Sequence, residues 1–459
     1  MSKVFIPPST RILLKLGLTV IFGSTLLLFG PLPISPVFAQ DATQSVDRIV
    51  SNDEPRLIAI FKLLHADPEL GFQEVKTSAL VAKELKALGY SVQTGIGKTG
   101  VVGILKNGAG PVIMLREDMD ALPVKEETNL DYASKKIMPG YDGIDTPVMH
   151  GCGHDAHTTW LIGTAKVMAQ LKAQWSGTLI LVAQPAEELG TGAVAMVKDG
   201  LYKNVPEPKV LISAHTSPIW PAGSVGLAPG RRMAGVDQLD VLIHGVGAHG
   251  STPQAGKDPV VMGSLAVMAY QTIISREIDP QEPSVLTVGS FQAGNANNVI
   301  PDSALLKLNL RWYSQDIRDH MITSIRRVTD SIANAANMPA DRMPEYTMKG
   351  HSTAVVNSDE AVKIAVPALK AELGASNVYP GVPPVMGSED FQMLAEPFKD
   401  TQILWIEIGA AKPEVMSNFF EKGIYPITNH NPKFQVELPA IAAGVKADSA
   451  VLLEFLKKN

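Results

Sequence analysis

The single cysteine of this 459-residue chain lies in a short run of metal-binding residue types, Met149-His-Gly-Cys-Gly-His-Asp-Ala-His157. Cys152 stands between two glycines, with one residue separating it from His154, and a predicted helix follows at once. A helix N-terminus and a nearby cation both lower the pKa of a thiol, and Cys and His at short range suit a transition metal of the zinc type. This motif alone leaves three interpretations open: a metal site, a small buried cysteine with incidental histidines, or a catalytic thiol.

Two adjacent carboxylates close a predicted apolar strand in the segment Gln184-Pro-Ala-Glu-Glu-Leu-Gly190. Neighbouring side chains diverge at such a point, so one carboxylate can bind a metal while the other faces the attacking water. Metal-assisted hydrolysis needs this pairing of a ligand with a general base. The alternative, taken from this motif alone, is a solvated acidic turn.

Isolated histidines follow at two further places. His215 ends a predicted strand in Ser213-Ala-His-Thr216, and His430 lies in a loop near the C-terminus in Thr428-Asn-His-Asn-Pro432. A lone histidine is more often a hydrogen-bonded structural residue than a ligand. The fragments Arg116-Glu-Asp-Met-Asp120 and Gly387-Ser-Glu-Asp390 add carboxylates at strand or loop ends, where α/β domains collect functional groups.

Alternating strands and helices must position these groups. Helical spacing of apolar residues indicates helices from about 51, over 78–88, 156–172 and 191–199. Short apolar runs indicate buried strands at 90–94, 100–105, 111–116, 178–184 and 209–215. This alternation predicts an α/β layer fold with a mostly parallel sheet.

The middle of the chain has a different order of elements. Strands are expected at 238–244, 284–291, 304–312 and 345–348. One helix should begin after Asp258 as its cap, with Val261, Leu265 and Met268 on one face, and another should cover about 316–335. The order βαββαβ predicts a ferredoxin-like unit at 229–349. It would be inserted between the two parts of the α/β domain, 40–228 and 350–459.

Residues 1–39 have the pattern of a secretory signal peptide. They carry Lys3, Arg11 and Lys15 with no acidic residue, then an apolar run, and they end in Val37-Phe-Ala39. The alternative is an uncleaved membrane anchor. We expect export to the periplasm or the medium, which changes the formal net charge from −6 to −9 because three basic residues are removed.

Composition narrows the class further. A single cysteine excludes an intramolecular disulfide and a cysteine-rich structural zinc site. Mild acidity without a block of like charges argues against nucleic-acid and membrane-surface partners. The mature chain should therefore be a soluble globular enzyme.

Six motifs in one order give the chain a specific resemblance over about residues 50–456. Four of the motifs have been described above and cover Leu115–Pro123, His150–His157, Gln184–Glu188 and Gly387–Phe391. The other two are Gly247-Ala-His-Gly-Ser-Thr-Pro253 and Asn298-Val-Ile-Pro301. The sequence resembles subfamily D of the M20 metallopeptidases, a group with hippurate hydrolases, auxin-conjugate hydrolases and N-acetyl-amino-acid deacetylases. The resemblance implies a zinc-peptidase-like catalytic domain with an inserted lid and dimerisation domain, and metal-dependent hydrolysis of N-acyl-L-amino acids.

The resemblance also assigns roles to matching positions. It implies two divalent ions, Mn, Zn, Co or Ni, with five ligands: Cys152, His154, Glu188, His215 and His430. Cys152 would bridge the ions and Glu187 would be the general base. His249 of the lid would stabilise the oxyanion, in some relatives from the partner subunit of a homodimer. Asn298 and Arg311 would hold the substrate carboxylate, or else be structural residues of a turn and a strand end.

Two departures from the family pattern bear on substrate choice. Glu117 stands where the family usually has a small residue, so it either adds charge near the metals or faces away from them. The C-terminal motif, Asn429-His-Asn-Pro432, keeps His430 and Pro432, but the residues beside them differ from the usual family pattern. A dipeptidase or aminopeptidase on a related scaffold and a non-catalytic, exported ligand-binding protein remain as alternatives.

Overall fold

The protein was analysed as a computed structural model that describes residues 37–458, with side chains from residue 45. The predicted signal peptide lies outside the described residues except for its last three, which begin helix α1 (Val37–Ala66). Across the described range, none of the helices is both long and apolar enough to cross a bilayer. Export and cleavage stay predictions.

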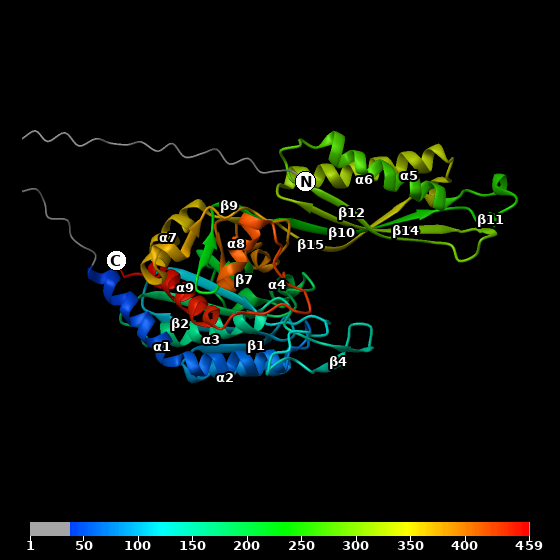
Figure 1. The fold of residues 1–459 in the computed structure, drawn as a ribbon. Coiled ribbons are helices and arrows are strands. Elements are labelled where there is room, and N and C mark those ends of the chain that lie inside the picture. Colours follow the sequence, from blue (N-terminus) through cyan, green and yellow to red (C-terminus); the bar gives the residue numbers. More distant parts are fainter. Residues whose placement is uncertain (1–36, 459) are drawn as a thin grey trace, which may run out of the picture. The chain divides into compact units, whose positions relative to one another are not determined.

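A large mixed sheet contains the strands whose ends carry the predicted site residues (Figure 1). Within residues 37–458 its order is β1-β2-β6-β3-β7-β18-β8-β17. The strands are β1 (Ser91–Ile96), β2 (Gly100–Asn107), β3 (Val112–Asp118), β6 (Gly177–Gln184), β7 (Val210–Pro221), β8 (Val225–Leu227), β17 (Val378–Pro380) and β18 (Gln402–Ala411). The central strands β6, β3, β7 and β18 pair in parallel, whereas β1 and β2 add an antiparallel edge. The predicted α/β class with a mostly parallel centre is confirmed.

Apolar residues alternate between the two faces of this sheet. Ile113 and Leu115 of β3 enter a core with helices α1, α2 (Val75–Ala87), α3 (His154–Gln170), α7 (Asp359–Leu373) and α9 (Pro439–Phe455). Met114 points into a second core with α4 (Gly192–Lys198) and the short helix Phe391–Ala395. Because both faces are covered, only the strand ends are free to present polar groups.

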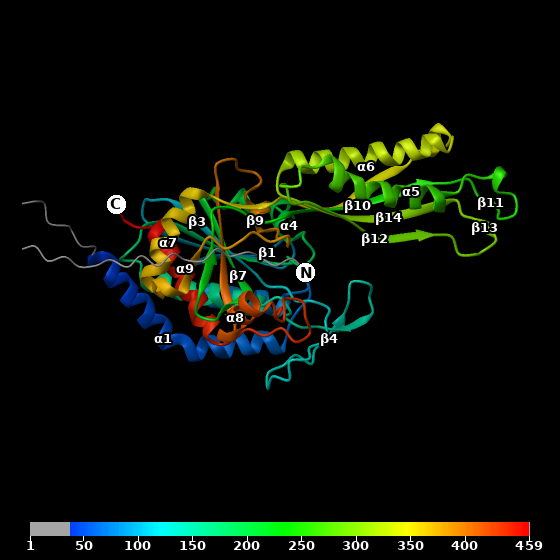
Figure 2. The ribbon, with the colours of Figure 1, turned by 45° about the horizontal axis from the view of Figure 1, so that its top comes forward.

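The inserted segment forms its own four-stranded antiparallel sheet, seen with its two helices in Figure 2. Its order is β12-β14-β10-β15, from β10 (Gly235–His244), β12 (Val285–Ala293), β14 (Ser303–Trp312) and β15 (Glu345–Ser352). Helices α5 (Pro259–Thr272) and α6 (Gln315–Ala335) join the strands in the predicted βαββαβ order and cover the sheet's separate apolar core. The exact domain boundaries at 228/229 and 349/350 stay a prediction.

Shorter elements complete the described chain. They are β4 (Ile137–Pro139), β5 (Asp145–Pro147), β9 (Gly230–Met233), β11 (Ala248–His249), β13 (Val299–Ile300), β16 (Val355–Asn357) and α8 (Pro413–Lys422).

Helix α5 differs from the simplest expectation for an apolar helix face. Asp258 caps it as predicted, accepting from the backbone N–H of Val260. The face of Val261, Leu265 and Met268 is nevertheless exposed, at 55%, 54% and 71%. The opposite face, with Met262 among its residues, packs on the sheet. Sequence periodicity identifies an apolar face, but it does not tell which neighbour covers it.

Candidate metal centre

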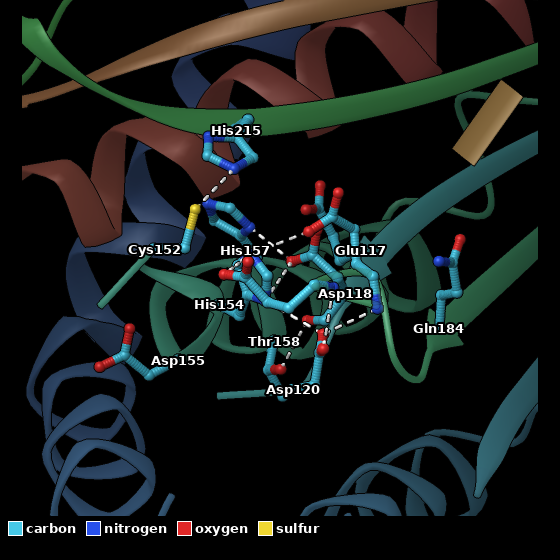
Figure 3. Close-up of polar contacts among 12 residues, drawn as sticks. Glu117, Asp118, Asp120, Cys152, His154, Asp155, His157, Thr158, Gln184 and His215 are labelled. Atoms are coloured by element: carbon cyan, nitrogen blue, oxygen red, sulfur yellow. Dashed lines mark hydrogen bonds and ion pairs between the residues drawn. The ribbon is translucent and has the colours of Figure 1, made fainter. Parts of the chain in front are cut away.

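The free ends of the central strands bring the sequence motifs together. Asp118 at the end of β3 lies opposite Gln184 at the end of the parallel strand β6, and β7 runs beside β3 on its other side. Helix α3 begins at His154, directly after the cysteine motif. Functional groups of open α/β sheets gather at the carboxyl ends of the strands, and Figure 3 shows such a cluster of His, Asp and Cys side chains here.

All five predicted metal ligands converge at this edge of the sheet. Cys152, His154 and His215 form one compact donor group, and Cys152, Glu188 and His430 form another; in each, the donor atoms lie within 4.8 Å of one another. The Cys152 sulfur lies 3.4 Å from Nε2 of His215, and Nε2 of His430 lies 3.4 Å from Oε2 of Glu188. The two groups share one atom, the sulfur.

Two buried atoms in this cluster lack a hydrogen-bond partner among the described residues. They are Nε2 of His154 and Oε1 of Glu188, which lie 3.9 Å apart. A buried polar atom left without a partner is costly and calls for an explanation, such as an ion. A lone imidazole nitrogen, a carboxylate oxygen and a sulfur are the donors that a transition metal prefers. The residues present therefore fit a divalent metal centre.

The ring nitrogens that face away from the cluster have their own acceptors. Nδ1 of His154 lies 3.2 Å from Oδ1 of Asp120, and Nδ1 of His215 lies 2.8 Å from the carbonyl oxygen of Thr216. When Nδ1–H donates to these acceptors, each Nε2 keeps its lone pair for a metal. This is the usual outer support of metal-binding histidines.

The environment favours the thiolate form of Cys152. Burial and the Glu188 carboxylate raise the pKa of this thiol, but the charge of His215, its hydrogen bond to the sulfur and the neighbouring His154 outweigh them and lower its pKa to about 6. Cys152 is 7% exposed. Only the thiolate binds metals strongly, so the sulfur is poised as a ligand.

The Glu187 carboxylate lies beside the donor groups, with Oε2 at 3.9 Å from Nε2 of His154. Burial, followed by the negative charges of Glu389 and Glu188, raises its pKa well above the usual range for a glutamate. A carboxyl group with a raised pKa holds a proton more readily than an ordinary glutamate does. The geometry is that of a general base next to a metal centre.

A cavity of about 690 Å³ opens over this cluster. The carboxylates of Glu187 and Glu188, together with Cys152, His215 and His430, line one side. The remaining wall includes apolar side chains and one cation of the inserted sheet: Leu189, Pro218, Ile219, Met233, Val236, Val385, Trp405 and Arg311.

Arg311 has no acidic partner in the described part of the chain. Its Nε donates to the side-chain oxygen of Asn309 at 2.8 Å, and burial lowers the pKa of the guanidinium group. A half-buried guanidinium that lines a cavity and is not paired with a carboxylate is suited to bind an anionic ligand.

His249 and Asn298 lie elsewhere. Both are exposed, and neither lines the cavity. His249 sits in β11, which pairs with β13 next to Asn298, and its Nδ1 contacts the hydroxyl of Ser251 at 2.7 Å. Within one subunit, the structure does not bring these two predicted residues to the metal ligands.

Sequence reasoning left several supporting residues without a role. Fully buried Arg116 pairs with Asp118 and Glu389, each at 2.9 Å, and Asp118 also holds Nδ1 of His157 at 2.6 Å. Asp120 accepts the backbone N–H groups of Glu187 and Glu188. Their positions at strand ends were the available signal, whereas their partners are set by tertiary structure.

A family model described as Peptidase family M20/M25/M40 matches residues 114–453. The chain belongs to this family. It is 41% identical over 336 residues to hippurate hydrolase of Campylobacter jejuni, which covers 72% of this chain and 83% of the relative. It is 30% identical over 457 residues to IAA-amino acid hydrolase ILR1-like 2 of Arabidopsis thaliana, covering 96% of each.

A solved structure shows the same fold. It is a dinuclear metal-binding peptidase of the M20 family from Bacillus subtilis, with a TM-score of 0.70 and 27% sequence identity over 88% of this chain and 99% of that chain. The resemblance drawn from the sequence motifs is confirmed, and so is the predicted enzyme class, a metal-dependent amide hydrolase.

Glu117 faces away from the metal ligands. Its side chain is fully buried, Oε1 accepts from the backbone N–H of Ala214 at 3.3 Å, and Oε2 has no partner among the residues described. Burial, followed by the nearby carboxyl of Asp448, raises its pKa well above the usual range. Burial therefore favours the neutral form of Glu117, and its side chain points away from the metal ligands.

This environment predicts that Glu117→Gln stabilises the protein at alkaline pH. A carboxyl group with a raised pKa in the folded state costs nothing below its unfolded pKa, and its cost grows as pH rises above that value. The permanently neutral amide should leave the melting temperature of metal-free protein unchanged at about pH 4.5 and raise stability on the order of 1–2 kcal/mol at pH 8. Thermal unfolding in EDTA measures both, with the exposed Glu207→Gln as control. An equal shift at both pH values contradicts the prediction.

Proposed function

We propose that the protein hydrolyses the amide bond of N-acyl-L-amino acids with two divalent metal ions, releasing a carboxylic acid and an amino acid. The observation that carries this proposal is the pair of donor groups that share Cys152 beside the Glu187 carboxylate. The relatives named hippurate hydrolase and IAA-amino acid hydrolase support an acyl-amino acid as the substrate class.

The two donor groups indicate which residues would hold the ions. Cys152, His154 and His215 would hold one ion, and Cys152, Glu188 and His430 the other, with the thiolate between them. A mixed set of nitrogen, oxygen and sulfur donors accepts Mn, Zn, Co or Ni, and availability decides among them.

The protein side chains account for the proton transfers. When bound, divalent ions polarise the amide carbonyl and ease deprotonation of water. Glu187 takes the proton of the attacking water on its carboxylate and delivers it to the nitrogen of the leaving amine. The raised pKa of Glu187 favours holding the proton between the two steps.

Arg311 is the residue that we propose for the substrate carboxylate. It is the unpaired guanidinium in the cavity wall, and a guanidinium binds a carboxylate through two parallel hydrogen bonds. Asn298 is not among the residues that line the cavity, so we assign it no part in this role within one subunit.

We further propose that the protein forms a homodimer in which His249 reaches the cavity of the partner subunit. His249 is exposed away from its own cavity, and the exposed apolar face of α5 belongs to the same inserted unit. An isolated apolar face of this kind on a folded unit is typical of an interface. The partner's His249 would then donate to the developing oxyanion.

Export to the periplasm or the medium is part of this proposal. It rests on the basic, apolar and small-residue order of residues 1–39.

Glu187→Gln should abolish turnover while metal stays bound. The amide cannot accept the water proton, so kcat should fall by about 10²- to 10⁴-fold. Release of glycine from N-benzoylglycine, with added Mn²⁺, Zn²⁺, Co²⁺ or Ni²⁺, measures turnover, and elemental analysis measures metal content. Glu207→Gln is the matched surface control. Unaltered turnover removes Glu187 from its role, and a wild-type enzyme that prefers dipeptides with a free amine favours a peptidase.

Arg311→Met should weaken recognition of the carboxylate specifically. Loss of the charged partner of a buried carboxylate costs roughly 2–5 kcal/mol, so KM for N-benzoylglycine should rise by at least tenfold. The wild type should prefer N-benzoylglycine to N-benzoylglycinamide, which has no carboxylate, and the variant should lose this preference. A variant that keeps the wild-type preference places the carboxylate elsewhere.

Two inactive variants should restore activity when mixed. In a mixed dimer of His249→Ala and Glu187→Gln, the cavity with Glu187 receives the intact His249 of the other chain. Random exchange of subunits should return about a quarter of wild-type activity. No recovery after unfolding and joint refolding contradicts a histidine donated between subunits.

Changing Leu265 and Met268 to Glu should yield monomers in analytical ultracentrifugation, because both side chains lie on the proposed interface.

A further inference from the structure

The turn that carries both glutamates has a strained backbone. Ala186, directly before Glu187, has a φ of +50°, in the left-handed region that residues other than glycine seldom adopt. Such a conformation costs about 1–3 kcal/mol and persists only when the surrounding contacts hold it. The contacts that hold this turn therefore help to decide where Glu187 and Glu188 point.

Three successive backbone N–H groups of the turn donate to buried carboxylates. Those of Glu187 and Glu188 donate to the two oxygens of Asp120, at 3.1 and 3.0 Å. The third, that of Ala186, donates to Oε1 of Glu74 at 2.8 Å. Asp120 also contacts the ligand His154 directly, whereas the side chain of Glu74 bonds to Thr99 and to the Ala186 backbone and to no member of either donor group.

Glu74 is itself firmly held. It is 0% exposed, and its other oxygen accepts from the hydroxyl of Thr99 at 2.6 Å. The chain before it packs against the turn, because a Cβ built on Gly71 would lie 3.0 Å from Cα of Ala186. The segment 71–74 thus forms a rigid support beneath the strained residue.

We propose that Glu74 is a positioning residue, which fixes the turn of Glu187 and Glu188 by accepting the backbone N–H of Ala186. The inference rests on the proposed function for the roles of the two glutamates. The position of the turn depends on where the acceptor oxygen of residue 74 lies and not on the charge of the carboxylate, because the partner is a backbone N–H group.

A matched pair of variants separates reach from charge. Glu74→Gln keeps the length of the side chain, and its amide oxygen can accept from Ala186 while its NH₂ group donates to the Thr99 hydroxyl. Glu74→Asp keeps the charge but withdraws the acceptor by about 1.5 Å, the length of one carbon–carbon bond. Both changes are conservative, so folding can be verified by circular dichroism and thermal unfolding before comparison.

We expect Glu74→Asp to lower kcat by about 10- to 100-fold with little change in KM, because the general base is displaced from a productive geometry. Its affinity for Co²⁺ should fall by about 10- to 100-fold, since outer supports of ligands have effects of this size. The Co²⁺–thiolate absorption of Cys152 reports binding without turnover. Glu74→Gln should stay within about threefold of wild type in both measurements.

Two further variants test the route through Ala186. Thr99→Val removes the second hydrogen bond of Glu74 but leaves the bond to Ala186, so its kcat and Co²⁺ affinity should fall less than those of Glu74→Asp. Ala186→Gly, added to Glu74→Asp, should restore most of the lost kcat, because glycine adopts a positive φ without steric cost.

The outcomes are distinguishable from failure of the proposed function. A wild-type protein that binds Co²⁺ but cleaves no N-acyl amino acid contradicts the proposed function, and the Co²⁺ comparison still tests Glu74. Wild-type Co²⁺ affinity in Glu74→Asp overturns the inference. So does a Glu74→Gln variant as impaired as Glu74→Asp, which would assign the effect to charge, or a Glu74→Asp variant that Ala186→Gly does not rescue.

Discussion

Crowding of negative charge in a place with little water is the constraint on which the rest of this structure depends. Asp118, Asp120, Glu187, Glu188 and the Cys152 thiolate meet at the carboxyl ends of the central strands. An unpaired ionised group in such a place is strongly unfavourable. The permanent cation buried among them, Arg116, is already paired with acidic side chains. The divalent ions of an M20 enzyme supply the missing positive charge, so the same acids that destabilise the bare fold create the metal centre.

The period of a β-strand sorts these acids. Successive side chains of β3 point to opposite faces, so Arg116 and Asp118 join the buried polar network while Glu117 between them points the other way. A buried carboxyl group is stabilised differently on the two faces of the sheet. On one face, cations and hydrogen-bond donors stabilise the carboxylates, whereas on the other face burial next to Asp448 favours the neutral form of Glu117. A family position usually occupied by a small residue thus takes a glutamate without adding charge to the site.

The sequence was sufficient to predict what local patterns encode. The α/β class and the βαββαβ insertion follow from apolar periodicity. The motifs and the family resemblance pointed to the side chains that the structure brings together at the sheet edge, while their roles as ligands and base stay predictions. The support of the site could not be predicted, because Glu74 and Asp120 act on a turn more than sixty residues away through backbone amides. The exposure of the α5 face could not be predicted, because apolar spacing does not specify which neighbour covers a helix face, whereas the family resemblance already allowed His249 to act from a partner subunit.

The exposed apolar face of α5 and the position of His249 away from its own cavity have a common physical meaning. His249 does not line the cavity of its own chain, so under the proposed function the donor for the oxyanion would be missing from a single subunit. An apolar helix face left in water is likewise incomplete as part of a fold. The apolar helix face and His249 both belong to the inserted unit, which has its own apolar core. In the proposed dimer, one association of two subunits would bury the helix face and complete the cavity, so that stability and catalysis would depend on the same contact.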